Sequence, residues 1–237
     1  MKNGTIKVKI CDLKDRYPMG TDFLYKFSKE HPQILEKYKE ELRRTANNNT
    51  RPVLETKIRI LTANERIQIL ANIKVGNDDA TNFHKISFDN LIHIFGVRFS
   101  KPNREAEIND GRKRIDIVFN NNDKDGFFGQ LNTLYHVHCP KIFVECKNYG
   151  REIGNPEIDQ LQTRFSNQRG KFGILLCRSI QDKTTLIQRC KDVLHDRQGY
   201  IIVLDDNDIA TLLKFKEAGD ETKIDDFMKK KLDELIM

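Results

Sequence analysis

The stretch Ile142-Phe143-Val144-Glu145-Cys146-Lys147 carries the strongest signal in this chain. Its apolar start predicts a short buried strand, bounded by Pro140 before it and Gly150 after it. Alternation along a strand places Glu145 and Lys147 on one face, about 7 Å apart. Charged groups at the end of a buried strand are costly unless they are paired, bound to a metal or solvated in a cleft. The stretch therefore predicts a functional site.

A second apolar strand is predicted upstream, at Arg114-Ile115-Asp116-Ile117-Val118-Phe119, and it carries one acid in its middle. This Asp, followed by Glu-x-Lys on a neighbouring strand, resembles the signature of the PD-(D/E)xK nucleases. The surrounding residues are similar to the restriction-endonuclease-like, Mrr-type branch of that superfamily, at residues 111–116, 145–149, 155–157 and Gln160. The resemblance covers roughly residues 79 to 213.

The resemblance implies an α/β fold, with a restriction-endonuclease-like mixed β-sheet core flanked by helices, and metal-dependent hydrolysis of phosphodiester bonds. Asp116 and Glu145 would offer carboxylate oxygens to Mg²⁺, for which Mn²⁺ can substitute, and Cys146 its backbone carbonyl. Lys147 would orient the attacking water or neutralise charge in the transition state. Gln160, on the following helix, either borders this site as in the family or belongs to a solvated helix face.

One position departs from the family pattern. The helix predicted over residues 79 to 96 often supplies a glutamate to the site in the family, and the matching residue here is His84. An acid on a β-hairpin, Glu107, is an alternative source of that carboxylate, since a tight turn at Asp110-Gly111 places it opposite Arg114. Glu107 is then either a metal ligand or one half of an exposed ion pair worth about a few tenths of a kcal/mol. His84 is alternatively a group that orients water or contacts a phosphate. If neither His84 nor Glu107 acts, Asp116, Glu145 and Lys147 form the whole site.

The domain organisation is predicted from the same boundaries. Residues 1–77 form a mostly helical N-terminal region that positions substrate, contacts a partner or simply packs. Residues 78–218 form the nuclease domain, and residues 219–237 form a C-terminal amphipathic helix. Within this frame, strands separated by helices after the Glu-x-Lys strand predict a partly parallel sheet.

Local signals set the expected ends of several elements. Residues 62–65, Thr-Ala-Asn-Glu, form a capping-box pattern that opens a helix ending at Gly76. Asn155 is expected to cap a second helix, with Pro156 at its first position and Gly170 at its end. Two further apolar strands are expected, at residues 172–177 and 200–204.

Charge fits a nucleic-acid partner. Lys and Arg outnumber Asp and Glu by 41 to 35, which leaves a net charge of +6. Six basic residues are candidates for holding phosphates around the cleft: Arg112, Lys113, Arg151, Arg164, Arg169 and Arg178. Contacts to phosphates position a nucleic acid without reading its sequence. Each of these residues is alternatively a solvated surface charge.

The compartment follows from the cysteines and the hydropathy pattern. Five cysteines without a CxxC spacing do not form a disulfide framework, so a reducing cytoplasm is expected. No apolar segment approaches the ~20 residues that span a membrane, and the first residues lack the apolar core of a signal peptide. We therefore expect a cytoplasmic protein without a membrane partner.

The leading hypothesis is a Mg²⁺-dependent endonuclease that acts on double-stranded DNA in restriction or phage defence. An RNA nuclease and a branched-DNA resolvase are alternatives within the same enzyme class. From another class, a nuclease-like module would bind nucleic acid or a partner protein without cutting. Double-strand cleavage by a chain with one site favours a homodimer. A partner protein bound through the N-terminal region is the other expected assembly.

Overall fold

The computed structural model describes residues 27–34, 36–37, 61–108 and 113–237. The chain divides into two compact units, Met1–Arg59 and Ile60–Met237. In the first unit, residues 27–30, 32–34 and 36–37 are helical, and His31 interrupts the helix directly before Pro32. Most of the predicted N-terminal helical extension lies outside the described residues. The second unit contains the predicted nuclease strands.

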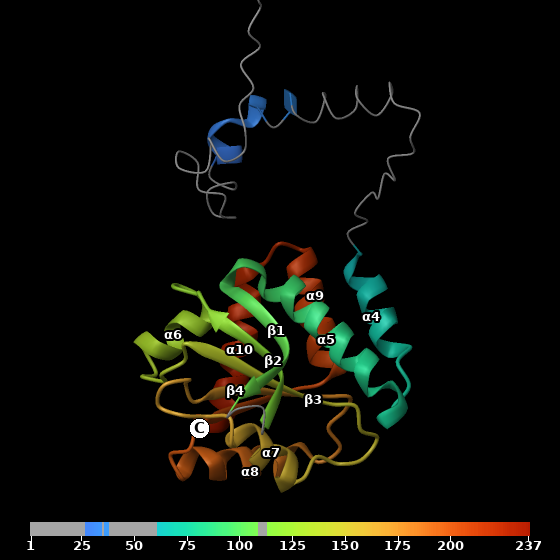
Figure 1. Cartoon of the computed structure of the whole chain (residues 1–237), viewed down its shortest axis with the longest axis vertical. Helices are drawn as coiled ribbons and strands as arrows, with labels where there is room; N and C mark the ends of the chain where they lie inside the picture. Colours follow the sequence, from blue (N-terminus) through green and yellow to red (C-terminus); the bar gives the residue numbers. More distant parts are fainter. Residues whose placement is uncertain (1–26, 35, 38–60, 109–112) are drawn as a thin grey trace, which may run out of the picture. The chain divides into compact units, whose positions relative to one another are not determined.

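A five-stranded mixed sheet with the order β1-β2-β3-β4-β5 forms the centre of the second unit (Figure 1). The antiparallel portion consists of β1 (Phe99–Ile108), β2 (Lys113–Asn121) and β3 (Lys141–Lys147). The parallel portion adds β4 (Phe172–Cys177) and β5 (Tyr200–Leu204) to β3. The α/β class with a partly parallel sheet is therefore confirmed. All residues of β4 are buried, as expected for an apolar run covered on both faces.

Helices pack around this sheet. Their bounds are α4 (Ala63–Ala71), α5 (Ala80–Phe95), α6 (Phe127–Thr133), α7 (Asn155–Gln162), α8 (Lys183–His195), α9 (Asp206–Glu217) and α10 (Glu221–Ile236). Helix α5 packs on β1 and β3, whereas α7 packs on β3 and β4 (Figure 1). Each helix that the structure describes is too short or too polar to span a bilayer.

The register of the antiparallel strands positions the candidate site. Glu107 pairs with Arg114 across β1 and β2, as predicted, while the turn at residues 109–112 lies outside the described portion of the chain. Pairing between β2 and β3 runs from Asn120 opposite Lys141 to Ile117 opposite Val144 and stops there. The two strands therefore diverge just before they reach the two predicted acids. Strand β3 continues its pairing with β4 as far as Lys147.

Two helices end earlier than their glycines predicted. Helix α4 ends at Ala71 and Asn72 follows it as the cap residue, so Gly76 lies beyond the helix. Helix α7 ends at Gln162, well before Gly170. A Cβ on Gly170 would stand 2.9 Å from Pro140 Cδ, at a φ of +104°. This glycine is therefore required by a close approach of two loops and not by a helix terminus.

The start of α7 also differs by one residue from the prediction. Gly154, not Asn155, is the cap residue, and Pro156 still lies in the first turn. The Gly154 backbone N–H donates to Glu157 Oε2 at 2.9 Å, so Glu157 supplies the cap from inside the helix. Helix α4, in contrast, begins with the predicted capping box of Thr62 and Glu65.

The predicted boundary near residue 77 lies inside the second unit. Ala63 and Leu70 of α4 are buried in its core, and the Ala63 backbone N–H donates to Glu217 Oε1 at 2.9 Å. At the other end, α10 buries Met228 and Leu232 in the same core. Helices α4 and α10 therefore belong to the second unit. The sequence pattern of α4 predicts a helix with one apolar face, but it does not predict which of the two units that face packs against.

Candidate active site

The site lies where β2 and β3 diverge. Asp116 Oδ2 accepts the Cys146 backbone N–H at 2.8 Å, in the place where a paired β2 would have offered a backbone carbonyl. The bond satisfies a backbone donor that the end of the ladder leaves without a strand partner. It also holds the Asp116 carboxylate against β3. The local fold thus brings the two predicted acidic positions together.

Glu145 is the most confined charged group of the site. It is 0 % exposed, and its Oε1 accepts a hydrogen bond from Lys147 Nζ at 2.8 Å. Its other oxygen, Oε2, is buried without a hydrogen-bond partner. Burial, and then the neighbouring Asp116 carboxylate, raises the pKa of Glu145 to about 7, although Lys147 opposes the shift. An unpartnered buried carboxylate oxygen beside a second acid is the environment that a cation would stabilise.

Lys147 is held between two acceptors. Its Nζ donates to Glu145 Oε1 and, at 2.9 Å, to Gln160 Oε1 on α7. Burial lowers the pKa of Lys147, but the Glu145 and Asp116 charges outweigh burial, so the pKa lies above its ordinary value. Lys147 therefore stays a cation at neutral pH. The Gln160 amide contacts the site, in line with the first of its two predicted roles.

His84 reaches the same place from α5. Its Nε2 lies 3.3 Å from the Cys146 carbonyl oxygen and 3.7 Å from Asp116 Oδ2. The side chain is 28 % exposed, so it lines the open side of the site. Ser87, one turn further along α5, is buried. The position that departs from the family pattern therefore still lies in the site.

The Cys146 side chain takes no role in this chemistry. Burial, with the charges of Asp116 and Glu145, raises the pKa of its thiol well above the ordinary value. Because the thiolate is the reactive form, this cysteine is inert as a nucleophile. Only its backbone N–H and carbonyl face the site, as the bonds to Asp116 and His84 show.

The hairpin residues are described only incompletely. Glu107 pairs with Arg114 in the predicted register, but the structure gives their backbone alone. Arg112 lies outside the described residues, and Lys113 begins β2 without a described side chain. The predicted roles of these residues therefore stay predictions.

The predicted phosphate-binding arginines fall into two groups. Arg151 is exposed at 63 %, donates to Glu157 Oε1 at 2.7 Å, and has its guanidinium carbon 4.4 Å from the centre of the Tyr149 ring. Its side chain is therefore accessible at the surface beside Tyr149, and its role in holding a phosphate stays a prediction. Arg164 is 6 % exposed and close enough for its charge to lower the pKa of Glu145. Arg164 therefore supports the site from within the protein rather than from its rim.

Arg178 does not border a cleft, so this prediction is wrong. Its side chain is 8 % exposed and donates to Asp206 Oδ2 at 2.7 Å and to the Ile73 carbonyl at 2.8 Å. A third bond, 2.9 Å to Asn148 Oδ1, ties it to the residue after Lys147. Arg178 caps the chain that leaves α4 and fixes the end of β3. A sequence does not show that an arginine is surrounded by backbone carbonyls.

Asn148 is a residue whose role the sequence did not reveal. Its Nδ2 donates to the carbonyls of Lys74 and Gly76, at 2.8 and 2.7 Å. The Gly76 backbone N–H returns a bond to the Asn148 carbonyl at 2.9 Å. The residue directly after the candidate lysine is thus locked to the segment that follows α4. The only signal in the sequence was a polar residue directly after a buried strand.

Among the described residues, no group of three or more His, Cys, Asp or Glu side chains is arranged to hold a metal ion. The predicted donor set is of another kind, because it combines two carboxylates with the Cys146 backbone carbonyl. Burial and the neighbouring Asp116 charge both disfavour the ionised form of Glu145, and a bound cation would relieve both effects. Hard oxygen donors of this type are the ligands that Mg²⁺ takes in proteins.

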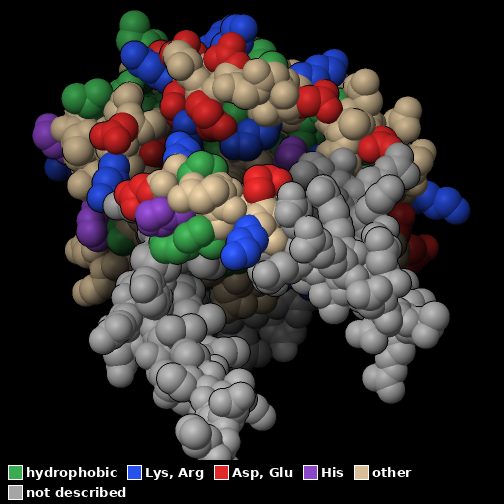
Figure 2. All heavy atoms as spheres, turned by 90° about the horizontal axis from the view of Figure 1, so that it is seen from above, with side chains coloured by type: hydrophobic (Ala, Val, Ile, Leu, Met, Phe, Trp, Pro, Cys, Tyr) green, Lys and Arg blue, Asp and Glu red, His purple; other side chains and the backbone are tan. Residues whose placement is uncertain are grey.

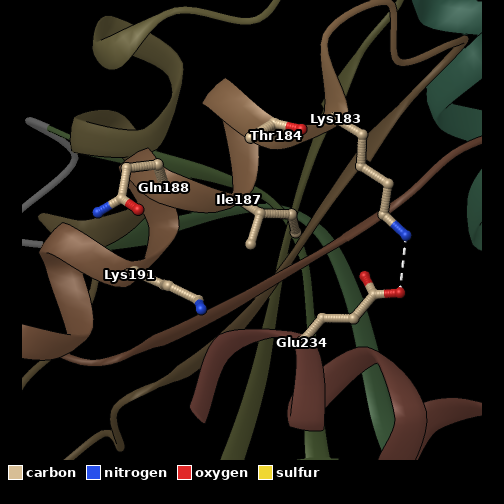
Figure 3. A pocket seen from close by; sticks show the side chains of 6 residues that line it. All are labelled: Lys183, Thr184, Ile187, Gln188, Lys191 and Glu234. Atoms are coloured by element: carbon tan, nitrogen blue, oxygen red, sulfur yellow. Dashed lines mark hydrogen bonds and ion pairs between the residues drawn. The ribbon is translucent and has the colours of Figure 1, made fainter. Parts of the chain in front are cut away.

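A separate hollow of about 380 Å³ lies between α8 and α10 (Figure 3). Lys183 Nζ and Glu234 Oε1 form an ion pair of 2.7 Å across it. None of the predicted catalytic residues lines this hollow. Its lining residues are Lys183, Thr184, Ile187, Gln188, Lys191 and Glu234.

No family model matches the chain, and no curated protein sequence is significantly similar to it. Among solved structures, the chain is similar to the restriction endonuclease FokI, with a TM-score of 0.47 and 13% identity over 73% of this chain and 30% of that one. It is also similar to the MspJI restriction endonuclease in complex with a 27-mer oligonucleotide, with a TM-score of 0.38 and 9% identity over 76% of this chain and 39% of that one. The chain thus spans well under half the length of either protein. The likeness concerns the arrangement of the fold.

Proposed function

We propose that this protein is a metal-dependent nuclease that hydrolyses phosphodiester bonds of DNA at the point where β2 and β3 diverge. One observation carries the proposal. Glu145 is fully buried, shares one oxygen with Lys147, and keeps the other without a partner next to Asp116. The arrangement places two acids beside a buried lysine, and a bound cation would relieve the repulsion between the two acids.

The donor set would be Asp116, Glu145 and the Cys146 carbonyl. A divalent cation there, Mg²⁺ or Mn²⁺, would supply acidification of the attacking water and neutralisation of charge on the phosphate. The protein holds the set in place with few degrees of freedom, since Asp116 is bonded to the β3 backbone and Glu145 to Lys147. Such preorganised charge contributes to catalysis without rearrangement during the reaction.

Lys147 acts as a fixed positive charge. Because its pKa is raised, it keeps its proton at neutral pH and cannot serve as the general base. Its Nζ has three protons, and Glu145 and Gln160 accept two of them. The third remains for a water molecule or a phosphate oxygen. With this proton Lys147 can perform either predicted role, orienting the attacking water or stabilising charge in the transition state.

Double-stranded DNA is the proposed substrate, with Arg151 as a phosphate contact near the site. Figure 2 shows Lys and Arg side chains interspersed with Asp and Glu on the described portion of one face. A mixed surface of this kind favours local phosphate contacts over long-range steering. A homodimer would let two such sites act on the two strands.

The biological role and the cellular location of this activity are part of the proposal. A role in restriction or phage defence rests on the motif resemblance. A cytoplasmic location is supported by four described cysteines, Cys139, Cys146, Cys177 and Cys190, which are all buried and unpaired.

A second candidate function is a nuclease-like module that binds nucleic acid or a partner protein without cutting. The observation that favours it is His84, which occupies the position where a third carboxylate was expected. With only two acids, the site would bind a hard cation more weakly.

The test is cleavage by the purified full chain. Supercoiled plasmid and a structured RNA are incubated separately with the protein in Mg²⁺, in Mn²⁺ and in EDTA. The proposal expects nicked or linear plasmid with either metal and intact plasmid in EDTA. Cleavage of the RNA but not of the plasmid would show that the substrate is RNA rather than DNA. Intact nucleic acid in all conditions, with binding retained in a gel-shift assay, would establish the second candidate instead.

A further inference from the structure

We infer that the loop after α4 positions the Lys147 ammonium for the reaction, and that it does so through Asn148. The loop, residues 72–76, is called the anchor segment below. Asn148 is then a positioning residue, because it acts through Lys147 and not on the substrate. The inference deepens the proposed function and rests on it, since it concerns the same lysine.

The end of β3 has backbone pairing on one side only. Pairing with β2 stops at Val144, whereas pairing with β4 continues as far as Lys147, opposite Cys177. Strand β3 ends at Lys147 and the chain then leaves the sheet. Contacts other than the ladder must therefore fix the direction in which the chain leaves Lys147.

Asn148 supplies these contacts. It is 2 % exposed, and its Nδ2 donates to the carbonyls of Lys74 and Gly76, at 2.8 and 2.7 Å. Its Oδ1 accepts a hydrogen bond from Arg178 Nη1 at 2.9 Å, and its backbone carbonyl accepts the Gly76 N–H at 2.9 Å. The residue next to Lys147 is thus held by four hydrogen bonds, three of them to the anchor segment.

The anchor segment is itself held to the core. Ile73 is buried, and its carbonyl accepts a hydrogen bond from Arg178 Nη1 at 2.8 Å. The Lys74 backbone N–H donates to Asp79 Oδ2 at 3.0 Å. The same guanidinium nitrogen thus bonds both Ile73 and Asn148, which couples the anchor segment to the end of β3. A functional group is placed most accurately when hydrogen bonds behind it fix its support in this way.

Lys147 depends on this support because its ammonium is carried on a flexible four-carbon stem. Nζ donates to Glu145 Oε1 at 2.8 Å and to Gln160 Oε1 at 2.9 Å, and both bonds require the Lys147 backbone to stay in place. A misplacement of about 1 Å in a site can slow a reaction about 100-fold. Because the stem can compensate for part of a shift, we expect loss of the Asn148 contacts to slow cleavage about 10- to 100-fold.

A purely structural role would explain the same hydrogen bonds. Asn148 would then only hold the anchor segment against the sheet, and its loss would lower the thermal stability of the protein. The folded fraction would keep a normal site, with the cleavage rate and the Lys147 ammonium of the wild type. The two explanations therefore differ in the state of Lys147 and not in the melting temperature.

Two variants disturb the contact from opposite sides. Asn148→Ala removes the carboxamide. Gly76→Ala leaves every hydrogen-bonding group in place but strains the backbone that Asn148 contacts, because φ at Gly76 is +126°. Among the described residues, no heavy atom apart from the chain neighbours lies within 4 Å of the added methyl group, so the effect is strain and not collision.

Gly219→Ala is the matched control. Gly219 also has a positive φ, of +70°, and an added methyl group there likewise meets no described atom within 4 Å beyond its chain neighbours. The residue lies between α9 and α10, and its N–H donates to the Lys216 carbonyl. The substitution therefore introduces the same kind of strain at a place that does not contact Asn148.

Two kinds of measurement on the full chain follow these variants. Single-turnover cleavage at saturating metal and DNA gives the rate, fluorescence anisotropy gives the DNA affinity, and thermal unfolding shows that each variant is folded. Nitrogen-15 NMR of the lysine side chains in the metal-free protein observes the Lys147 ammonium directly, and Lys147→Gln identifies its signal. An ammonium held by two acceptors away from water exchanges its protons slowly and gives a resolved signal, whereas a freed ammonium does not.

We expect the resolved signal in the wild type and in Gly219→Ala. Asn148→Ala and Gly76→Ala should broaden it and slow cleavage about 10- to 100-fold, with unchanged DNA affinity. The inference fails if the wild type gives no such signal, or if the folded variants keep the signal or the wild-type rate. If Asn148→Ala does not fold, Gly76→Ala decides alone, because it keeps every hydrogen-bonding group.

The outcome separates this inference from the proposed function. A wild type that cuts no DNA removes the proposed function, and the ammonium signals then decide whether the anchor segment holds Lys147. A wild type that cuts DNA, with Asn148→Ala and Gly76→Ala cutting equally fast, supports the proposed function and removes the inference.

Discussion

At the scale of single residues, Glu145 and Lys147 form a buried ion pair beside a second acid, Asp116. Removing two charges from water costs several kcal/mol per ion, roughly what their attraction returns. One oxygen of Glu145 is moreover left without a partner. The sequence could predict which residues these are, because Glu-x-Lys closes an apolar run. It could not predict that Glu145 would be held so far from water that its pKa reaches about 7.

The raised pKa of Glu145 gives a pH-dependent stability in the absence of metal. Between its ordinary value of 4.5 and about 7, the unfolded chain loses the Glu145 proton while the folded chain keeps it. Ionisation therefore favours the unfolded state, and stability is lost as pH rises through this window. Relative to Glu145→Gln, we expect the wild type in EDTA to lose up to about 3 kcal/mol between pH 4.5 and 8.

Urea unfolding of both proteins across this pH range measures the difference. Asp159→Asn, which removes an exposed acid on α7, serves as the control and is expected to follow the wild type. A difference between the wild type and Glu145→Gln that is constant with pH would mean that Glu145 ionises normally in the folded protein.

Gln160 is predicted to position Lys147. Replacing it with leucine removes the acceptor 2.9 Å from Lys147 Nζ and frees the ammonium to leave its place. A hydrogen bond to a charged group contributes about 1.5–3 kcal/mol, so the cleavage rate should fall by about one to two orders of magnitude. Single-turnover rates at saturating metal measure this. Gln162→Leu on the same helix is the control, and an equal loss there would point to damage of α7 rather than of the site.

At the scale of elements, strands were easier to predict than helix ends. Strands β4 and β5 appear at the predicted residues because buried parallel strands are continuous apolar runs. The ends of α4 and α7 predicted from Gly76 and Gly170 were wrong. Each glycine has a positive φ in a loop beyond its helix, and Gly170 also lies in close contact with Pro140. The role of Arg178 could not be predicted, since it depends on carbonyls distant in the sequence.

Arg178 is predicted to join α4, β3 and α9 into one stable unit. Arg178→Met leaves the largely buried Asp206 without its cation and frees the carbonyls of Leu70 and Ile73. Breaking a buried pair from one side costs about 3–5 kcal/mol. We expect a loss of about 3 kcal/mol in the free energy of unfolding from urea titration.

The matched control is the more exposed pair of Lys183 and Glu234. Lys183→Met should cost less than about 1 kcal/mol, because water screens such pairs. Similar losses in the two variants would show that the burial of Arg178 does not govern its contribution.

At the scale of the whole molecule, one compact unit from Ile60 to Met237 contains every described candidate residue. The excess of positive charge is small, at +6, and charges of both signs mix on the face in Figure 2. DNA affinity should therefore come from a limited number of phosphate contacts near the site. Composition could predict that the net charge is positive and would attract a polyanion. Only the fold shows that Arg164 and Arg178 are too buried to contribute at the surface.

Salt dependence is the whole-molecule prediction. Binding of Glu145→Gln to a DNA duplex should weaken steeply with salt, with a slope of about −0.9 in log K against log salt for each phosphate contact. Arg151→Gln should reduce that slope by about one contact. Fluorescence anisotropy at several salt concentrations measures both. A flat salt response would indicate that the natural partner of this surface is a protein.

The most direct test of the central claim is the rate at which Glu145→Gln nicks supercoiled plasmid in Mn²⁺, compared with the wild type and Asp159→Asn. Glutamine keeps the shape of the buried side chain but removes the charge that a cation requires. We expect a fall of about two to three orders of magnitude or more, with Asp159→Asn at the wild-type rate. A Glu145→Gln protein that cuts at the wild-type rate in Mn²⁺ and stops in EDTA would place the metal and the chemistry elsewhere.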